Sequence, residues 1–147
     1  MKRPATMSKA DQELIAAATA AIKLRYRDDW QEVGAALRTR SGKIFTGVNL
    51  DAYLGRMAVC AEAVALGRAF VDLGDDGIDR IVAVRHPPPH QKDQTIAVVS
   101  PCGACRELIS DYDPKARVIV PSPHPTLPRK RGRDCLLYTS PSPRDRQ

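Results

Sequence analysis

The chain has 147 residues, of which 43% are hydrophobic, and it carries a formal net charge of +6 at pH 7. This length suits one domain around a single core. No run of about 18 apolar residues exists, and the charged start is not followed by the apolar segment of a signal peptide. The composition therefore predicts a cytoplasmic protein with no membrane partner.

Helix and strand patterns alternate along the chain. Ser8 is a typical helix N-cap, Asp11 lies in the first turn, and Ala- and Leu-rich spacing continues this helix to about residue 25. Residues 33–39 and 43–48 have the pattern of two strands around a tight turn. Further patterns predict helices over residues 59–73 and 102–112, and strands over residues 78–84, 95–99 and 116–120. Such alternation predicts an α/β fold with a layered sheet.

Two short strings carry the chemistry: Cys60-Ala61-Glu62 and Pro101-Cys102-Gly103-Ala104-Cys105. Three thiolate ligands leave the fourth position of a tetrahedral zinc ion open to water, and zinc lowers the pKa of water from about 15.7 to about 7. The carboxylate of Glu62 follows the first cysteine by two residues, where it can move protons without binding the metal. This arrangement is typical of zinc nucleobase deaminases.

Each string also lies at the start of a predicted helix. A helix N-terminus presents free amide N–H groups and the positive end of the helix dipole, and both favour thiolate over thiol. Two such ends that meet at one edge of a sheet can hold Cys60, Cys102 and Cys105 around one metal ion. Glu62, in the first turn of its helix, is then expected to face the metal site.

The strings resemble those of the small cytidine deaminases, in the all-cysteine branch that includes blasticidin S deaminase. Val33-Gly34-Ala35-Ala36-Leu37 and the stretch 41–49 support the resemblance, which covers residues 8–121. It implies a three-layer α-β-α fold with a mixed sheet of about five strands, a Zn²⁺ cofactor and a homotetramer. The implied reaction is hydrolysis of cytidine or deoxycytidine to uridine or deoxyuridine and ammonia, in pyrimidine salvage.

The resemblance also assigns roles to single residues. Glu62 would accept a proton from the attacking water and deliver it to the ring nitrogen, and it would then deliver a further proton to the departing ammonia. Asn49 and Asp51 match the asparagine and the acidic residue that bind the ribose hydroxyl in nucleoside-specific relatives. Backbone groups of Ala61 and Ser100 would contact the base.

Two other interpretations stay open. A different aminated heterocycle, such as blasticidin S, fits the same chemistry, because the residues of the sugar pocket match only in part. A non-catalytic binding module stabilised by zinc would need a fourth ligand, for which Cys135 is the only remaining cysteine. A structural zinc site would also not require a carboxylate at Glu62. His86 and His90 flank a proline run and are predicted to be loop residues rather than ligands.

Small residues recur on the second predicted helix, at Ala61, Ala63, Ala65 and Ala69. A row of this kind fits either close contact between the subunits of a tetramer or packing inside the core. Residues 1–7 are predicted to be a flexible N-terminus that precedes the domain.

The sequence after Pro121 breaks the preceding patterns. Six of the 23 Lys and Arg residues and two of the 17 Asp and Glu residues lie there, so residues 122–147 carry +4 and the rest of the chain only +2. The folded part therefore gives no reason to expect a nucleic-acid partner. Residues 122–147 are predicted to be a disordered basic tail. From about Cys135 the letters match one reading frame of a sequencing-library adapter, which predicts a non-native end and a domain truncated at its C-terminus.

Overall fold

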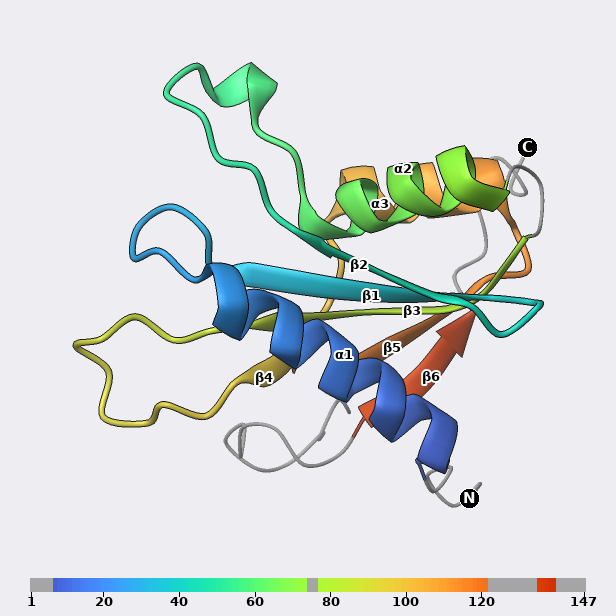
Figure 1. Ribbon diagram of the computed structural model, residues 1–147, viewed down its shortest axis with the longest axis horizontal. Coiled ribbons are helices and arrows are strands. Elements are labelled where there is room, and N and C mark those ends of the chain that lie inside the picture. Colours follow the sequence, from blue (N-terminus) through green and yellow to red (C-terminus); the bar gives the residue numbers. More distant parts are fainter. Residues whose placement is uncertain (1–6, 74–76, 122–134, 140–147) are drawn as a thin grey trace.

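The computed structural model describes residues 7–73, 77–121 and 135–139 (Figure 1). Its elements in chain order are helix α1 (Lys9–Arg25), strands β1 (Val33–Thr39) and β2 (Ile44–Val48), the short 3₁₀ helix η1 (Gly55–Met57), helix α2 (Ala61–Leu73), strands β3 (Ile78–Arg85) and β4 (Ala97–Val99), helix α3 (Gly103–Tyr112), and strands β5 (Arg117–Pro121) and β6 (Cys135–Thr139).

These strands form one mixed sheet in the order β2-β1-β3-β5-β6. β1 runs antiparallel to both β2 and β3, whereas β3 and β5 are parallel. The short β4 pairs with β3 at Ala83 to Arg85, and β5 pairs with it at Arg80 to Val82. Since β1 occupies the other edge of β3, strands β4 and β5 share one edge, and the chain can turn from β4 directly into α3.

Helices cover both faces of the sheet (Figure 1). Leu14, Ala18 and Ile22 of α1 pack on one face, against a cluster that includes Val82 and Ile119. α2 and α3 pack on the opposite face, around a second cluster, to which they contribute Ala61, Ala65, Leu66, Ala69 and Ile109. The three-layer α-β-α fold with a mixed sheet is confirmed.

The alanine row of α2 lies in this core. Ala61, Ala65 and Ala69 are at most 6% exposed and pack toward the sheet. Of the two explanations for the small residues, core packing is therefore correct for these three. Close packing of α2 on the sheet also fixes the position of the helix start at Ala61, the middle residue of the Cys60-Ala61-Glu62 motif.

Element boundaries differ from the predicted ones in two places that matter. The second helix begins at Ala61 rather than at residue 59, because Leu50 and Val59 exchange two backbone hydrogen bonds of 2.9 and 2.8 Å as an isolated bridge. A strand was not expected within the predicted disordered tail, yet β6 pairs antiparallel with β5. The open edge of β5 explains this pairing, since unpaired backbone groups on an edge accept a further strand.

Other parts of the terminal predictions lie outside the described residues. These are the flexible start at residues 1–6 and the tail at residues 122–134 and 140–147. The adapter origin of residues from about 135 stays a prediction, since a strand pairs through its backbone whatever the source of its sequence.

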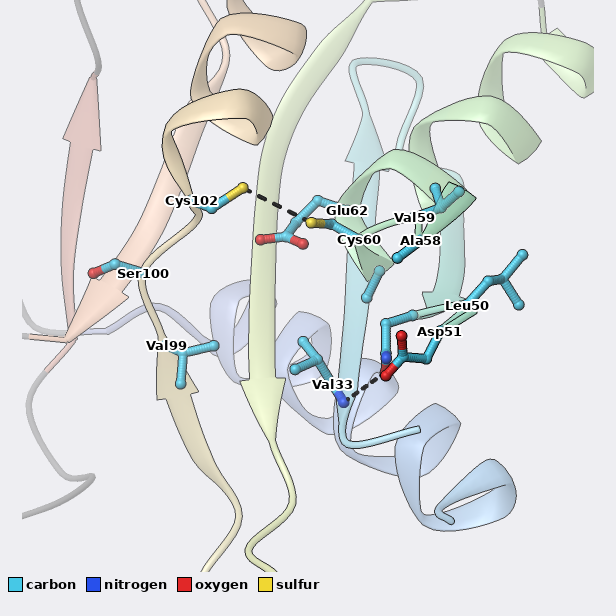
Figure 2. A pocket seen from close by; sticks show the side chains of 12 residues that line it. Val33, Leu50, Asp51, Ala58, Val59, Cys60, Glu62, Val99, Ser100 and Cys102 are labelled. Atoms are coloured by element: carbon cyan, nitrogen blue, oxygen red, sulfur yellow. Dashed lines mark hydrogen bonds between the residues drawn. The ribbon is translucent and has the colours of Figure 1, made fainter. Parts of the chain in front are cut away.

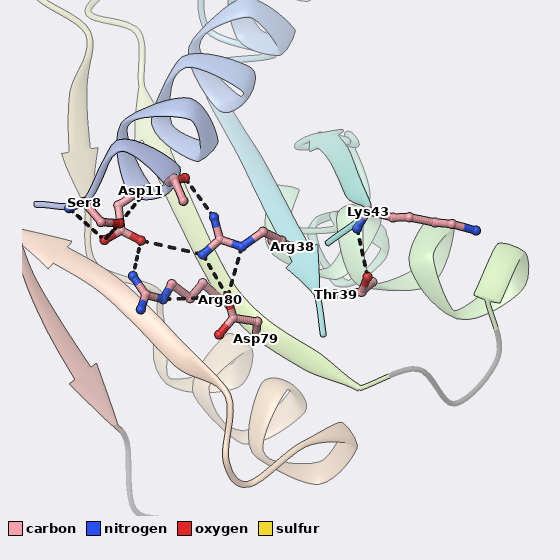
Figure 3. Close-up of polar contacts among 8 residues, drawn as sticks. Ser8, Asp11, Arg38, Thr39, Lys43, Asp79 and Arg80 are labelled. Carbon is pink, nitrogen blue, oxygen red and sulfur yellow. Dashed lines mark hydrogen bonds and ion pairs between the residues drawn. The ribbon is translucent and has the colours of Figure 1, made fainter. Parts of the chain in front are cut away.

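Helix α1 is attached to the sheet through a cluster of charged side chains (Figure 3). Ser8 and Asp11 form the reciprocal capping box that starts the helix. The buried Asp11 carboxylate also binds Arg80 of β3 and lies 3.8 Å from Arg38 of β1. Arg38 in turn contacts Asp79 at 2.8 Å. Burial raises the pKa of Asp11, but hydrogen bonds from Ser8 and Arg80 and the charge of Arg80 outweigh it, so the pKa lies below its ordinary value.

We expect Asp11→Asn to lower the free energy of unfolding at pH 7 by about 1.5–3 kcal/mol, the contribution of a hydrogen bond to a charged group. Because the folded state lowers the pKa of Asp11, its ionised form stabilises the protein above the ordinary pKa of Asp. That contribution is lost as the pH falls through the folded value. Urea unfolding at pH 7 and at decreasing pH should show the two proteins converge. Glu13→Gln on the exposed side of α1 is the control, and equal stability at pH 7 would contradict the expectation.

Gly47 of β2 allows α2 to lie close to the sheet. A Cβ atom at this position would lie 2.5 Å from the carbonyl oxygen of Ala61, 2.6 Å from the amide nitrogen of Ala65 and 3.0 Å from Cβ of Val64. The first two neighbours are backbone atoms of α2 and cannot rotate away. Any side chain at residue 47 must therefore push the first turns of α2 away from the sheet.

We expect Gly47→Ala to destabilise the protein by about 1–3 kcal/mol through overpacking. Displacement of the α2 start should also weaken binding of metal at Cys60, which directly precedes the helix. Gly67→Ala on the same helix is the matched control, because nothing lies within 4 Å of its added Cβ and alanine favours the helix. Thermal unfolding and zinc content measure both effects; an unchanged metal content in Gly47→Ala would show that the helix start tolerates the shift.

Candidate active site

The first two motif cysteines lie at helix starts. The carbonyl of Cys60 accepts the first helical hydrogen bond of α2, from the amide of Val64 at 3.2 Å. Cys102 is the N-cap of α3, and its Sγ accepts a hydrogen bond from the amide of Cys105 at 3.4 Å. The predicted placement of both strings at helix N-termini is thereby confirmed.

The three cysteines converge on one point. Their Sγ atoms all lie within 4.8 Å of one another, and those of Cys60 and Cys102 are 3.8 Å apart. A tetrahedral zinc ion with Zn–S bonds of about 2.3 Å requires sulfur atoms about 3.8 Å apart. Cys60 and Cys102 are exposed, whereas Cys105 is buried, so the site opens on one side. The donor set and its spacing fit zinc with one position left for another ligand.

Crowding affects the acidity of these thiols. Burial raises the pKa of Cys105, and the nearby Glu62 carboxylate raises it further. Burial and the Cys102 sulfur raise the pKa of Cys60. Burial also acts to raise the pKa of Cys102, but hydrogen bonds from the Cys105 amide and from the Cys105 and Cys60 thiols together outweigh it, and the net pKa is lowered. Three sulfurs this close repel one another when ionised, so they need a cation to be thiolates together.

Glu62 lies in the first turn of α2, beside the cysteines. Its side chain is only 6% exposed, and Figure 2 shows the carboxylate next to the Cys60–Cys102 pair. Burial raises the pKa of Glu62, while hydrogen bonds from its own backbone and from Cys105 act in the opposite direction. A buried carboxyl group with a raised pKa beside a metal site is suited to taking up and releasing a proton.

A pocket of about 330 Å³ opens beside this cluster (Figure 2). Its lining includes seven of the eight residues predicted for the site; the eighth, Cys105, belongs to the sulfur cluster. The seven are Asn49, Asp51, Cys60, Ala61, Glu62, Ser100 and Cys102. The structure therefore brings all the predicted site residues into one place.

The remaining pocket lining is apolar and was not predicted. It consists of Val33, Leu50, Ala58, Val59 and Val99. These side chains give the pocket walls suited to a flat, weakly polar ring. Their position next to motif residues is the signal that could have found them, since Leu50 separates Asn49 from Asp51, and Val59 precedes Cys60.

His86 and His90 both lie outside the helices and strands, as predicted for loop residues. The ring of His86 stacks on Tyr26 at a centroid distance of 3.8 Å, and its Nδ1 lies 2.8 Å from the carbonyl oxygen of Pro87. His90 is exposed. Neither histidine belongs to the sulfur cluster found among residues 7–73 and 77–121.

This site combines three convergent cysteines and a buried carboxylate at one pocket of an α-β-α fold. Such a combination is typical of a metal-dependent hydrolase in which a glutamate side chain transfers the protons. Residues 8–121 match the family model described as the cytidine and deoxycytidylate deaminase zinc-binding region. The chain belongs to this family of zinc-dependent hydrolytic deaminases, which act on amino-heterocycles.

Individual relatives agree with this assignment. The chain is 51% identical over 114 residues to blasticidin-S deaminase of Bacillus cereus, covering 78% of this chain and 81% of that protein. It is 35% identical over 80 residues to cytidine deaminase of Sporosarcina psychrophila, covering 54% of this chain and 52% of that enzyme. The crystal structure of cytidine deaminase from Burkholderia pseudomallei superposes with a TM-score of 0.65 at 28% identity, covering 87% of this chain and 91% of that one.

The family assignment fixes the cofactor as zinc, with Cys60, Cys102 and Cys105 positioned to hold it. Among the helices that the structure describes, none is both long and apolar enough to span a lipid bilayer.

Proposed function

We propose that the protein deaminates cytidine or deoxycytidine by hydrolysis, releasing ammonia and the corresponding uridine. The observation that carries the proposal is the position of Glu62 beside three convergent cysteines at the end of an apolar pocket. Zinc bound by Cys60, Cys102 and Cys105 would supply Lewis-acid chemistry that makes a water molecule acidic near neutral pH.

Glu62 moves the protons of the reaction. Its carboxylate takes one proton from the attacking water and gives it to the ring nitrogen next to the amino-bearing carbon. The new C–O bond makes that carbon tetrahedral. Glu62 then takes up the second proton of the water oxygen and passes it to the amino group, whose C–N bond breaks to release ammonia and leave a carbonyl.

The other pocket residues would select the ring and its substituent. The apolar side chains of Val33, Val59 and Val99 line the space for a flat base. Asp51 accepts a hydrogen bond from the amide of Ala52 through Oδ1, at 2.8 Å, so its second oxygen can serve a substrate hydroxyl. Backbone groups of Ala61 and Ser100 are the proposed contacts to the base.

Blasticidin S is the second candidate substrate. The observation that favours it is the 51% identity over 114 residues to a protein named blasticidin-S deaminase, against 35% over 80 residues to a cytidine deaminase. Both substrates carry an aminated heterocycle, so Glu62 and the cysteines would act in the same way on either. The difference would lie in the part of the pocket beyond the ring.

An ammonia-release assay of the zinc-loaded protein tests the proposal. Cytidine, deoxycytidine, cytosine and blasticidin S are supplied in parallel, and loss of the amino-heterocycle absorbance gives an independent readout. Turnover of cytidine or deoxycytidine supports the first candidate, and turnover confined to blasticidin S supports the second. A protein that holds one zinc ion and releases ammonia from none of them would favour the non-catalytic module.

We also propose that the enzyme works in the cytoplasm, in pyrimidine salvage, and as a homotetramer. The exposure of Cys60 and Cys102 beside the pocket supports the assembly, because a neighbouring subunit would close this open side. Leu54 and Met57, on the loop beyond the pocket, are more than half exposed and would be covered there. Light scattering over a concentration series checks this; a fully active monomer at every concentration would contradict it.

A further inference from the structure

Asn49, directly after β2, is hydrogen-bonded to the backbone of the segment before β1 through both its side chain and its own backbone amide. Its Oδ1 accepts hydrogen bonds from the backbone amides of Glu32 and Val33, both at 3.0 Å. Its Nδ2 donates to the carbonyl oxygen of Trp30 at 2.9 Å. The backbone amide of Asn49 donates to the carbonyl of Val33 at 3.0 Å. Four hydrogen bonds therefore attach this residue to the segment that leads into β1.

The residues held in this way form one side of the pocket. Val33 and Asn49 both line it, and Leu50 is the next lining residue. Leu50 exchanges two backbone hydrogen bonds with Val59, the residue before Cys60. Hydrogen bonds and peptide bonds thus connect the start of β1, through Asn49 and the Leu50–Val59 bridge, to the residue before Cys60.

A side-chain amide has two acceptor sites on its oxygen and two hydrogens on its nitrogen. In Asn49 both acceptor sites and one hydrogen are used by the backbone of residues 30–33. The backbone amides of Glu32 and Val33 are half-buried, so loss of their shared acceptor would cost free energy. One hydrogen of Nδ2 is left for a ligand.

We infer that Asn49 is a positioning residue that fixes the pocket wall at Val33 against the Leu50–Val59 bridge, and that it can give the substrate one donated hydrogen bond only. The substrate group next to Asn49 must then be an acceptor, such as a hydroxyl or carbonyl oxygen. This deepens the proposed function and rests on it for the identity of the substrate, but the positioning role is a property of the protein alone.

Amide hydrogen exchange of the full-length, zinc-loaded protein tests that role without any substrate. In Asn49→Ala the amides of Glu32 and Val33 lose their acceptor, and we expect them to exchange at least about tenfold faster than in the wild type. Asn49→Asp keeps an oxygen that accepts from both amides and should retain most of their protection. Gln94→Ala is the matched control, because that side chain donates to the carbonyls of Pro88 and Gln91, in another loop.

Kinetics with the substrate that the wild type turns over fastest provide the second readout. A positioning residue held through the bridge to Cys60 should change kcat as well as KM, so we expect Asn49→Ala to lower kcat/KM by about tenfold or more, with part of the loss in kcat. Asn49→Asp should recover part of kcat, because it restores the backbone acceptor.

The outcomes are separable. Unchanged exchange at Glu32 and Val33 in Asn49→Ala, or a rise in KM alone, would overturn the positioning role. If no candidate substrate is turned over, the proposed function fails while the exchange result still decides the inference. If Asn49→Ala does not fold, Asn49→Asp tests the positioning role instead. In that variant the amides of Glu32 and Val33 should stay protected. The fluorescence of Trp30, the only tryptophan, should shift because its carbonyl loses the hydrogen bond from residue 49. Loss of protection in Asn49→Asp would contradict the inference.

Discussion

Replacing Glu62 by glutamine should lower kcat by about 10²–10⁴-fold while the protein keeps its zinc and its fold. Glutamine has the size and shape of glutamate, so packing of the buried side chain beneath the pocket is preserved. It cannot accept a proton from water or deliver one to the ring, and no other carboxylate lines the pocket except that of Asp51. Ammonia release, zinc content and thermal unfolding of the same preparation measure the three quantities.

The control for this variant is Glu13→Gln, the same change on the exposed side of α1. It should leave kcat and zinc content at wild-type values. Since burial raises the pKa of Glu62, removal of its ionisable group should cost little stability, and the unfolding temperature should stay the same or rise. A Glu62→Gln protein with wild-type turnover would remove this residue from the mechanism.

Most of the metal site could be predicted because its residues are close in sequence and carry their own local signals. Cys102 and Cys105 are separated by two residues, Cys102 caps the helix that contains Cys105, and Glu62 follows Cys60 by two. Helix starts are decided by local capping and by the free amides of the first turn, so the sequence is sufficient to place them. The capping box at Ser8 was predictable for the same reason.

The role of Asn49 shows where sequence reasoning ends. The motif around it predicts a substrate ligand, but its hydrogen-bonding partners lie at residues 30–33, which follow a turn with Asp29 at a positive φ of 53°. No periodicity marks that turn. Only folding brings residues 30–33 beside the end of β2. The structure then shows that three of the four hydrogen-bonding positions of the Asn49 side-chain amide are occupied.

Strand β6 was missed for a different physical reason. Whether residues 135–139 form a strand depends on the free edge of β5, a tertiary property that propensity does not contain. The alanines of α2 gave a similar ambiguity, because small residues suit both a core and an interface. The burial of Ala61, Ala65 and Ala69 against the sheet decided it, and Gly47, which has no side chain, allows that close approach.

The last prediction concerns the metal itself. Cys105→Ser should abolish stoichiometric zinc binding and turnover together, because a hydroxyl is a far weaker zinc ligand than a thiolate and Cys105 supplies one of the three sulfurs that lie within 4.8 Å of one another. Loss of the metal should also lower stability, since a bound ion stabilises the folded state in proportion to the logarithm of its concentration over its Kd. Metal analysis after exhaustive dialysis and unfolding with and without added zinc measure these effects.

Cys135→Ser is the matched control, the same change at the fourth cysteine of the chain. Cys135 begins β6, at the end of the sheet opposite β2, where it pairs with Pro121. An open catalytic site held by three cysteines predicts wild-type zinc content and turnover for this variant. A structural site with four sulfur ligands predicts that Cys135→Ser loses zinc as Cys105→Ser does, and that Glu62→Gln has no effect on function. Because the two variants differ only in which thiol is removed, their zinc contents distinguish an open site of three cysteines from a structural site of four.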